Sequence, residues 1–292
     1  MAKLGALQAE HRPAAGPRRG PPVVLLHGVG LGRWFWERDQ GVLADMGLES
    51  WALDLPGHGE DAGRDVSLDE VVEGVRGALA QLDRPALIGH SMGGLVAQML
   101  TERLDLASVA LISPIACGGA GARPSPTTLS LLVRRAIPLL AGRPIQLDRA
   151  GYRAGGMKFV SDQTFERVLP LLTPWPNRLL RDLARPPRVP VPEPPVLIVQ
   201  GLLDPIVSLQ SSRLLADYYN AILWRFDDLG HTPPLEDGGV RLMQAVGEWV
   251  LAPRRRKIEE VDALSPDEGV GSAERERRRS RRVRSNSRFG ER

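Results

Sequence analysis

Ser91 is the residue whose surroundings most strongly suggest chemistry. It stands between two glycines in Gly89-His90-Ser91-Met92-Gly93, after the apolar run "PALI" and just before the apolar run "GLVAQML". This pattern predicts a strand, a sharp turn with the serine at its tip, and a helix. The serine is then either the N-cap of that helix or a nucleophile. A capping serine needs neither glycine, whereas a nucleophile in a strained turn needs both to avoid clashes, so the spacing favours the nucleophile.

A serine hydroxyl needs a base before it can attack, and the sequence holds five histidines. His11 lies in the predicted N-terminal loop region. His27 and His58 lie beside glycines that follow predicted strands, and His90 lies inside the turn itself. His231 lies in "DDLGHTPPLE", between the last predicted strand and the last predicted helix. A loop at that place can reach back over the turn, so we predict that His231 is the base.

A histidine base needs a carboxylate that fixes its tautomer and stabilises its charged form. Asp204 follows a predicted strand in "VLIVQGLLDPIVS" and is our candidate. Asp227 and Asp228 also follow a strand, but they are so near His231 in sequence that we expect a surface or loop-internal role. The predicted triad has the chain order Ser91, Asp204, His231, which is the order described for α/β-hydrolases.

The elements that must position these residues alternate along the chain. Short apolar runs predict strands, and segments with helical periodicity lie between them, which is typical of a parallel sheet with right-handed crossovers. The predicted strands cover residues 21–28, 48–55, 85–90, 106–114, 196–201 and 221–226, with a weak first strand within 4–12. Ser67 and Glu70 form a predicted capping box at the start of a helix over 67–82.

Residues 115–194 interrupt the alternation, because they contain proline-punctuated helical patterns and no convincing strand. We predict an α/β core formed by residues 1–114 and 195–252, with 115–194 as an inserted helical cap over the carboxyl edge of the sheet, where such sheets bind ligands. Residues 253–292 hold 13 Lys/Arg and 8 Asp/Glu with few apolar side chains. We expect this Arg-rich tail to be disordered.

Composition limits the classes of protein to consider. The chain has 292 residues, is 42% apolar and lacks an apolar run long enough to span a membrane. Its N-terminus is too polar for a signal peptide, so we expect a cytoplasmic protein. The single Cys117 cannot form an internal disulfide and is interpreted as a small core residue rather than a catalytic thiol. The overall charge of +3 comes from the tail, so it says little about the substrate.

Five motifs in this order resemble the α/β-hydrolase fold family over about residues 20–250: "LLHGVG", "DLPGHG", "GHSMGG", "GLLDPIV" and "GHTPPLE". The resemblance implies a mostly parallel sheet and a serine nucleophile. It also implies that the backbone N–H groups of Val29 and Met92 bind the oxyanion, with Gly28 and Gly30 allowing that backbone to come close. It assigns His27 and His58 to turns and packing.

Two further groups of residues have open interpretations. Trp34 and Trp36 either line the acyl pocket or belong to the core. The cap holds 12 Lys/Arg and 5 Asp/Glu. Some of its arginines could attract an acidic substrate, but we favour the interpretation that they lie on solvated helix faces. The arginines considered are Arg134, Arg135, Arg149 and Arg153.

The sequence therefore predicts a serine hydrolase that cleaves a carboxylic ester, thioester or lactone through an acyl-enzyme on Ser91. An acyltransferase, a C–C bond hydrolase or a perhydrolase on the same triad is the first alternative, because fold and triad do not choose among these reactions. A non-catalytic binding module with an Arg-rich interaction tail is the second. We expect no cofactor and no metal, a small-molecule acyl substrate and no nucleic-acid partner. The oligomeric state is not predicted.

Overall fold

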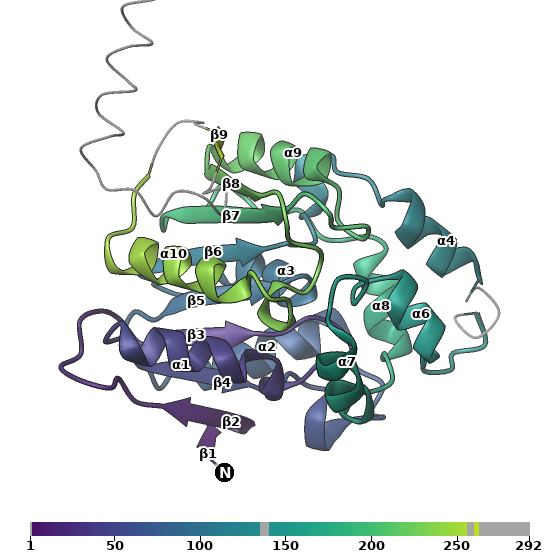
Figure 1. Cartoon of the computed structure of the whole chain (residues 1–292), viewed down its shortest axis with the longest axis horizontal. Coiled ribbons are helices and arrows are strands. Elements are labelled where there is room, and N and C mark those ends of the chain that lie inside the picture. The colour runs from purple at the N-terminus through teal and green to yellow at the C-terminus, as the bar shows by residue number, and fades with distance from the viewer. Residues whose placement is uncertain (1, 135–139, 256–259, 263–292) are drawn as a thin grey trace, which may run out of the picture. The chain divides into compact units, whose positions relative to one another are not determined.

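A computed structural model describes residues 2–134, 140–255 and 260–262 of the chain (Figure 1). Most of the predicted Arg-rich tail, 253–292, lies outside these residues, as does Arg135. No helix in the described parts of the chain is long and apolar enough to cross a membrane.

One twisted sheet organises the described chain (Figure 1). Its strands run in the spatial order β1-β2-β4-β3-β5-β6-β7-β8-β9. Strand β2 is antiparallel to both of its neighbours, β1 and β4, and the pairs from β4–β3 to β7–β8 are parallel. The strands are β1 (Ala2–Leu4), β2 (Leu7–Arg12), β3 (Val23–Leu26), β4 (Ser50–Leu53), β5 (Ala86–His90), β6 (Ser108–Ile112), β7 (Val196–Gly201) and β8 (Ile222–Phe226), and a short β9 (Glu260–Asp262) ends the described chain. The predicted α/β fold with a mostly parallel sheet is confirmed.

The weak first strand of the prediction is a hairpin of β1 and β2. His11 lies in β2 rather than in a loop, and its ring stacks on Trp51 with centroids 4.0 Å apart. Only Ala9 of β2 is buried, as fits a strand near the sheet edge, whereas every residue of β3 and β7 is buried. Helices cover both faces of a parallel sheet, so each residue of a central strand is buried. The sequences of the central strands are therefore unbroken apolar runs.

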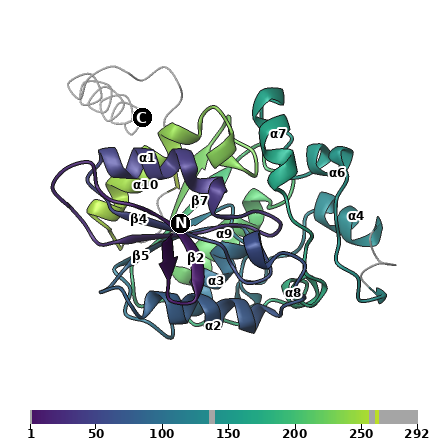
Figure 2. The same cartoon turned by 90° about the horizontal axis from the view of Figure 1, so that it is seen from below.

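Helices α1 and α10 cover one face of the sheet, and α2 and α3 cover the other (Figure 2). The helices around the sheet are α1 (Glu37–Asp45), α2 (Leu68–Leu79), α3 (Met92–Leu100), α9 (Leu209–Tyr219) and α10 (Gly239–Leu251). The capping box of α2 is present, with the Ser67 hydroxyl accepting from the Glu70 N–H at 3.2 Å. Helix α1 was not predicted from its sequence, whose charged and apolar residues give a weak helical period.

The insertion between β6 and β7 lies at the carboxyl ends of the strands, on the right in Figure 1. It contains α4 (Pro126–Arg134), α6 (Arg149–Ala154), α7 (Asp162–Val168) and α8 (Asn177–Leu183). An isolated antiparallel bridge joins Ile145 to Trp175 within it. Strands β6 and β7 are direct neighbours, with Val109 opposite Val196, so the insertion leaves and re-enters adjacent strands of the sheet.

Five short 3-10 helices complete the described elements. They are η1 (Arg33–Trp36), η2 (Gly59–Asp61), η3 (Gly118–Ala120), η4 (Leu169–Leu171) and η5 (Pro233–Leu235). Of these, η1 follows the loop after β3, and η5 follows the loop after β8. Both loops therefore begin at the carboxyl edge of the sheet, where the predicted site residues lie.

Candidate active site

Ser91 occupies the turn between β5 and α3. Its backbone has φ 53° and ψ −114°, and its side chain makes no capping hydrogen bond to the helix. A positive φ is unfavourable for a residue with a side chain and persists only where the surroundings enforce it. The Ser91 N–H donates to Ile112 O at 3.1 Å, and the Ile115 N–H donates to Ser91 O at 3.1 Å. The structure therefore does not support the helix-cap interpretation.

The two glycines of this turn are needed because backbone packs directly against them. A Cβ on Gly89 would lie 2.4 Å from Gly93 O, and a Cβ on Gly93 would lie 2.2 Å from Leu26 O. Gly28 approaches from the neighbouring loop, where an added Cβ would lie 3.2 Å from the Ser91 Cβ. The turn is thus packed too closely for any larger residue at positions 89 and 93.

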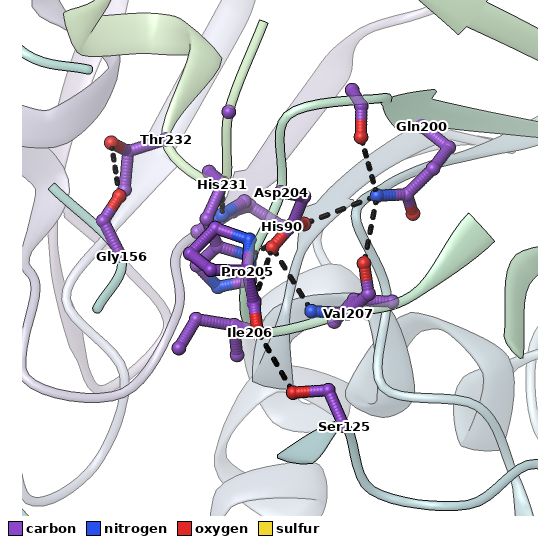
Figure 3. A network of polar contacts seen from close by, with 12 residues as sticks. His90, Ser125, Gly156, Gln200, Asp204, Pro205, Ile206, Val207, His231 and Thr232 are labelled. Atoms are coloured by element: carbon purple, nitrogen blue, oxygen red, sulfur yellow. Dashed lines mark hydrogen bonds and ion pairs between the residues drawn. The ribbon is translucent and has the colours of Figure 1, made fainter. Parts of the chain in front are cut away.

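Asp204 and His231 come together from the loops after β7 and β8. The His231 Nδ1 lies 2.8 Å from the Asp204 Oδ2 (Figure 3). The Asp204 Oδ1 accepts hydrogen bonds from the N–H groups of Ile206 and Val207 at 2.7 and 2.9 Å. Burial alone raises the pKa of Asp204, but His231 and these N–H donors outweigh burial and leave that pKa lowered. Asp204 is therefore ionised at neutral pH and holds a proton on the Nδ1 of His231.

Gln200, the penultimate residue of β7, supports the Asp204 loop (Figure 3). Its Nε2 donates to Asp204 Oδ2 at 3.2 Å and to Val207 O at 3.1 Å, while its Oε1 accepts from Ser212 at 2.6 Å. This residue was not predicted, because a single glutamine at a strand end carries no distinctive pattern.

Two buried side chains fix the backbone around His231. The Glu236 carboxylate accepts from the Gly230 N–H at 2.6 Å and from the Thr232 N–H at 3.0 Å, so it holds both residues that flank the histidine. His90 places its Nε2 2.7 Å from His231 O, and burial lowers the pKa of His90 to about 3, so this ring is neutral. Neither role was predicted, although Glu236 falls within the quoted motif "GHTPPLE".

Val29 and Met92, the predicted oxyanion donors, lie in the loop after β3 and at the start of α3. Met92 is the first residue of α3, and Val29 follows β3 in the loop that packs against Ser91. Among the described residues, neither backbone N–H finds a hydrogen-bond acceptor. Gly30, with φ 76°, presents its Cα to Trp175, and the Thr173 N–H donates to Gly30 O at 3.0 Å. The cap segment around Trp175 thereby holds the loop that carries Val29.

Ser91 and His231 both open into a cavity of about 290 Å³ between the sheet edge and the cap. Its wall is mainly hydrocarbon and comes from the loops after β3, β5, β6, β7 and β8 and from the cap. Trp34 and Trp36 are not among the lining residues, and Trp36 is fully buried in the core. Of the two interpretations left open for these tryptophans, the structure favours the core for Trp36, while Trp34 is half-buried outside the cavity lining. The tryptophan that lines it is Trp175.

Of the four cap arginines named above, the structure describes the side chains of Arg149 and Arg153, and acidic residues engage both. Arg149 pairs with Glu166, and Arg153 pairs with Asp162 and donates to Val160 O at 2.5 Å. Neither lines the cavity. The side chain of Arg134 is not described. Asp228, as expected, is a surface residue, and it pairs with Arg241 at 2.6 Å.

Cys117 is buried, in keeping with its predicted core role. Its N–H donates to the Gln98 Oε1 at 3.1 Å, and its sulfur lies 3.3 Å from the Tyr219 hydroxyl. These contacts tie the loop after β6 to α3 and α9. The thiol is not among the residues that line the cavity.

A profile of the alpha/beta hydrolase family matches residues 23–245, which is more than half of the chain. The chain therefore belongs to the α/β-hydrolase family. The probable esterase PIR7A of Oryza sativa subsp. indica is 31% identical over 125 residues, which are 41% of this chain and 48% of the rice protein. A dihydrolipoyllysine-residue acetyltransferase component of the acetoin cleaving system from Pseudomonas putida is 40% identical over 112 residues, which are 36% of this chain and 29% of that protein. These matches thus span about half or less of each relative.

Solved structures with the same fold cover most of the chain. The monoacylglycerol lipase of Paleococcus ferrophilus superposes with a TM-score of 0.66 at 24% identity, over 84% of this chain and 98% of that one. A thermophilic esterase from Thermogutta terrifontis gives a TM-score of 0.65 at 22% identity, over 84% and 92% of the two chains. At these identities the likeness establishes the fold.

Proposed function

We propose that this α/β-hydrolase cleaves a carboxylic ester, thioester or lactone through an acyl-enzyme on Ser91. One observation carries the proposal: a histidine bonded to a buried, ionised aspartate opens into the same cavity as a serine in a strained turn. No packing role requires a serine with positive φ in that place, whereas nucleophilic catalysis does.

The reaction begins when the Ser91 hydroxyl oxygen attacks the carbonyl carbon of the substrate. The Nδ1–H of His231 bonds to Asp204, so the Nε2 is free to take the serine proton and then to give it to the leaving group. Water activated by the same Nε2 attacks the acyl-enzyme and releases the acid. Asp204 stabilises the imidazolium that forms in both halves of the reaction.

The negative charge that develops on the carbonyl oxygen needs donors that are already in position. The N–H groups of Val29 and Met92 have no acceptor among the described residues, and the N-terminus of α3 adds a favourable dipole. Loss of one donor of this kind typically costs about 3–4 kcal/mol in the transition state. These two groups are therefore our candidates for the oxyanion hole.

Acyl transfer to an acceptor other than water is the second candidate. The local similarity to an acetyltransferase component supports it, and the same triad serves both reactions. Product analysis in the presence of a small alcohol or thiol separates the two, since a transferase forms the new ester or thioester in preference to the acid.

A fluorophosphonate probe tests the nucleophile directly. We expect it to label the wild-type protein at Ser91 and to leave Ser91→Ala unlabelled, with loss of ester hydrolysis in the same variant. Equal labelling of both proteins would reject the proposal. The cytoplasmic location and the absence of a nucleic-acid partner stay predictions.

A further inference from the structure

Three hydroxyl groups on the wall of the cavity beside Ser91 already donate their protons within the protein. Thr128 donates its hydroxyl proton to Ile206 O at 2.9 Å, Ser211 donates to Arg123 O at 3.3 Å, and Thr232 donates to Gly156 O at 2.9 Å. Each of these hydroxyl groups lines the cavity but directs its proton to a backbone carbonyl. A substrate therefore gains no donor from these three hydroxyls, although Trp175 Nε1, also on the wall, has no hydrogen-bond partner among the described residues.

The rest of the wall is mostly aliphatic. Ile115, Ile145, Leu147, Met157 and Val207 are examples from four different segments. No carboxylate lines the cavity in the part of the chain that the structure describes, and the permanent charge on the wall belongs to Arg123, which is exposed to solvent. A charged or strongly polar substrate group that lies among the aliphatic side chains, away from Arg123, would lose its water without gaining partners, which is costly.

The volume sets the size of what fits. A cavity of about 290 Å³ holds about ten heavy atoms, since an engineered protein cavity of roughly 150 Å³ binds one benzene molecule. We propose that the site takes neutral esters whose buried part is a hydrocarbon chain of about eight carbons. This inference rests on the proposed function, because it names the substrate class of the same site. It replaces the acidic substrate considered from the cap arginines, of which Arg149 and Arg153 are paired elsewhere.

Binding to the full-length Ser91→Ala protein tests the inference without requiring hydrolysis. The probes are the methyl ketones acetone, 2-pentanone, 2-octanone and 2-dodecanone, together with 7-oxooctanoate, which has a terminal carboxylate on an eight-carbon chain. By calorimetry we expect Kd to fall up to about fourfold per methylene as far as 2-octanone and then to level off. We expect 7-oxooctanoate to bind at least about tenfold more weakly than 2-octanone.

Two variants tie the length limit to this cavity. 2-Octanone nearly fills the cavity. A larger or smaller side chain on the cavity wall should therefore change the chain length at which Kd stops falling. Ala122→Leu adds three carbons to the wall, so Kd should stop falling at a chain about three carbons shorter. Leu147→Ala removes three carbons, so Kd should continue to fall to a chain longer by a similar length. Ala80→Leu, at an exposed position beyond the end of α2, is the matched control and should leave the series unchanged.

The outcomes separate this inference from the proposed function. The inference is wrong if 7-oxooctanoate binds as tightly as 2-octanone, if Kd does not change with chain length, or if neither cavity variant changes the length dependence. This holds even when the wild type is labelled at Ser91. If the ketone series behaves as expected while the wild type resists the fluorophosphonate, the hydrolase proposal fails and the apolar binding site stands.

Discussion

Glu236 shows how one carboxylate can hold a catalytic loop from both sides. Its two oxygens accept from the N–H groups on either side of His231, and the carbonyl of His231 itself is held by His90. Burial raises the pKa of Glu236, and the bonds from Gly230 and Thr232 and the nearby His231 oppose that rise. Glu236 is therefore a positioning residue whose charge also faces the imidazolium that forms during catalysis.

Glu236→Gln should lower kcat about tenfold with little change in KM, because the amide nitrogen meets one backbone N–H and the loop loses a bond. Losing the negative charge also disfavours the protonated imidazole, so the acidic limb of kcat against pH should move to lower pH. Steady-state kinetics from pH 5 to 9 measures both effects. Asp228→Asn, on the exposed start of the same loop, is the control. An unchanged pH profile in Glu236→Gln would limit Glu236 to a structural role.

The elements around the site were largely predictable, since Ser91, Asp204 and His231 each follow a strand whose apolar run is unmistakable. The chain alternates strand and helix except in the cap, and that pattern was sufficient for the parallel sheet. Helix α6 has six residues, too few to show a period, and was not predicted. The roles of Trp175, Gln200 and Glu236 depend on contacts between loops, and such contacts leave no local pattern in one sequence.

The turn between β5 and α3 makes a prediction at the scale of elements. In Gly93→Ala the new Cβ would meet Leu26 O and His27 O at 2.2 and 2.6 Å, so strand β3 and helix α3 must separate. We expect a loss of several kcal/mol in the free energy of unfolding, as for severe overpacking, and at least a hundredfold loss in kcat/KM. Thermal unfolding and active-site titration with the fluorophosphonate measure the two effects.

Gly77→Ala is the matched control, because Gly77 lies within α2 and an added Cβ there meets nothing within 4 Å. This change should stabilise the protein by up to about 1 kcal/mol and leave activity unchanged. If Gly93→Ala behaved in the same way as Gly77→Ala, the close packing of the turn would be unnecessary for catalysis.

Asp39 affects the stability of the whole molecule. It is fully buried in α1, and neither carboxyl oxygen has a hydrogen-bond partner among the residues that the structure describes. Burial raises the pKa of Asp39 to about 8, against a weaker opposing effect of Arg38. The folded protein thus keeps a proton on Asp39 that the unfolded chain releases near pH 4.

This difference in proton binding makes stability fall as pH rises. Between about pH 4 and pH 8 the folded state holds one more proton, so the free energy of unfolding should lose about 1.4 kcal/mol per pH unit from this group. Asp39→Asn removes the titration, so its stability relative to the wild type should grow across that window and then level off. Urea unfolding from pH 5 to 9 measures this trend. Asp45→Asn, at the exposed end of the same helix, should show no such trend.

Because β6 pairs directly with β7, the insertion between them can vary in length and sequence without disturbing the sheet. The cap of about 80 residues begins and ends on adjacent strands, which are separated by only about 5 Å. Its length and sequence are therefore not constrained by the spacing of the sheet, while the strands on either side keep Ser91, Asp204 and His231 at one edge. A different insertion joined at the same two strands would present a new cavity wall to an unaltered set of catalytic groups.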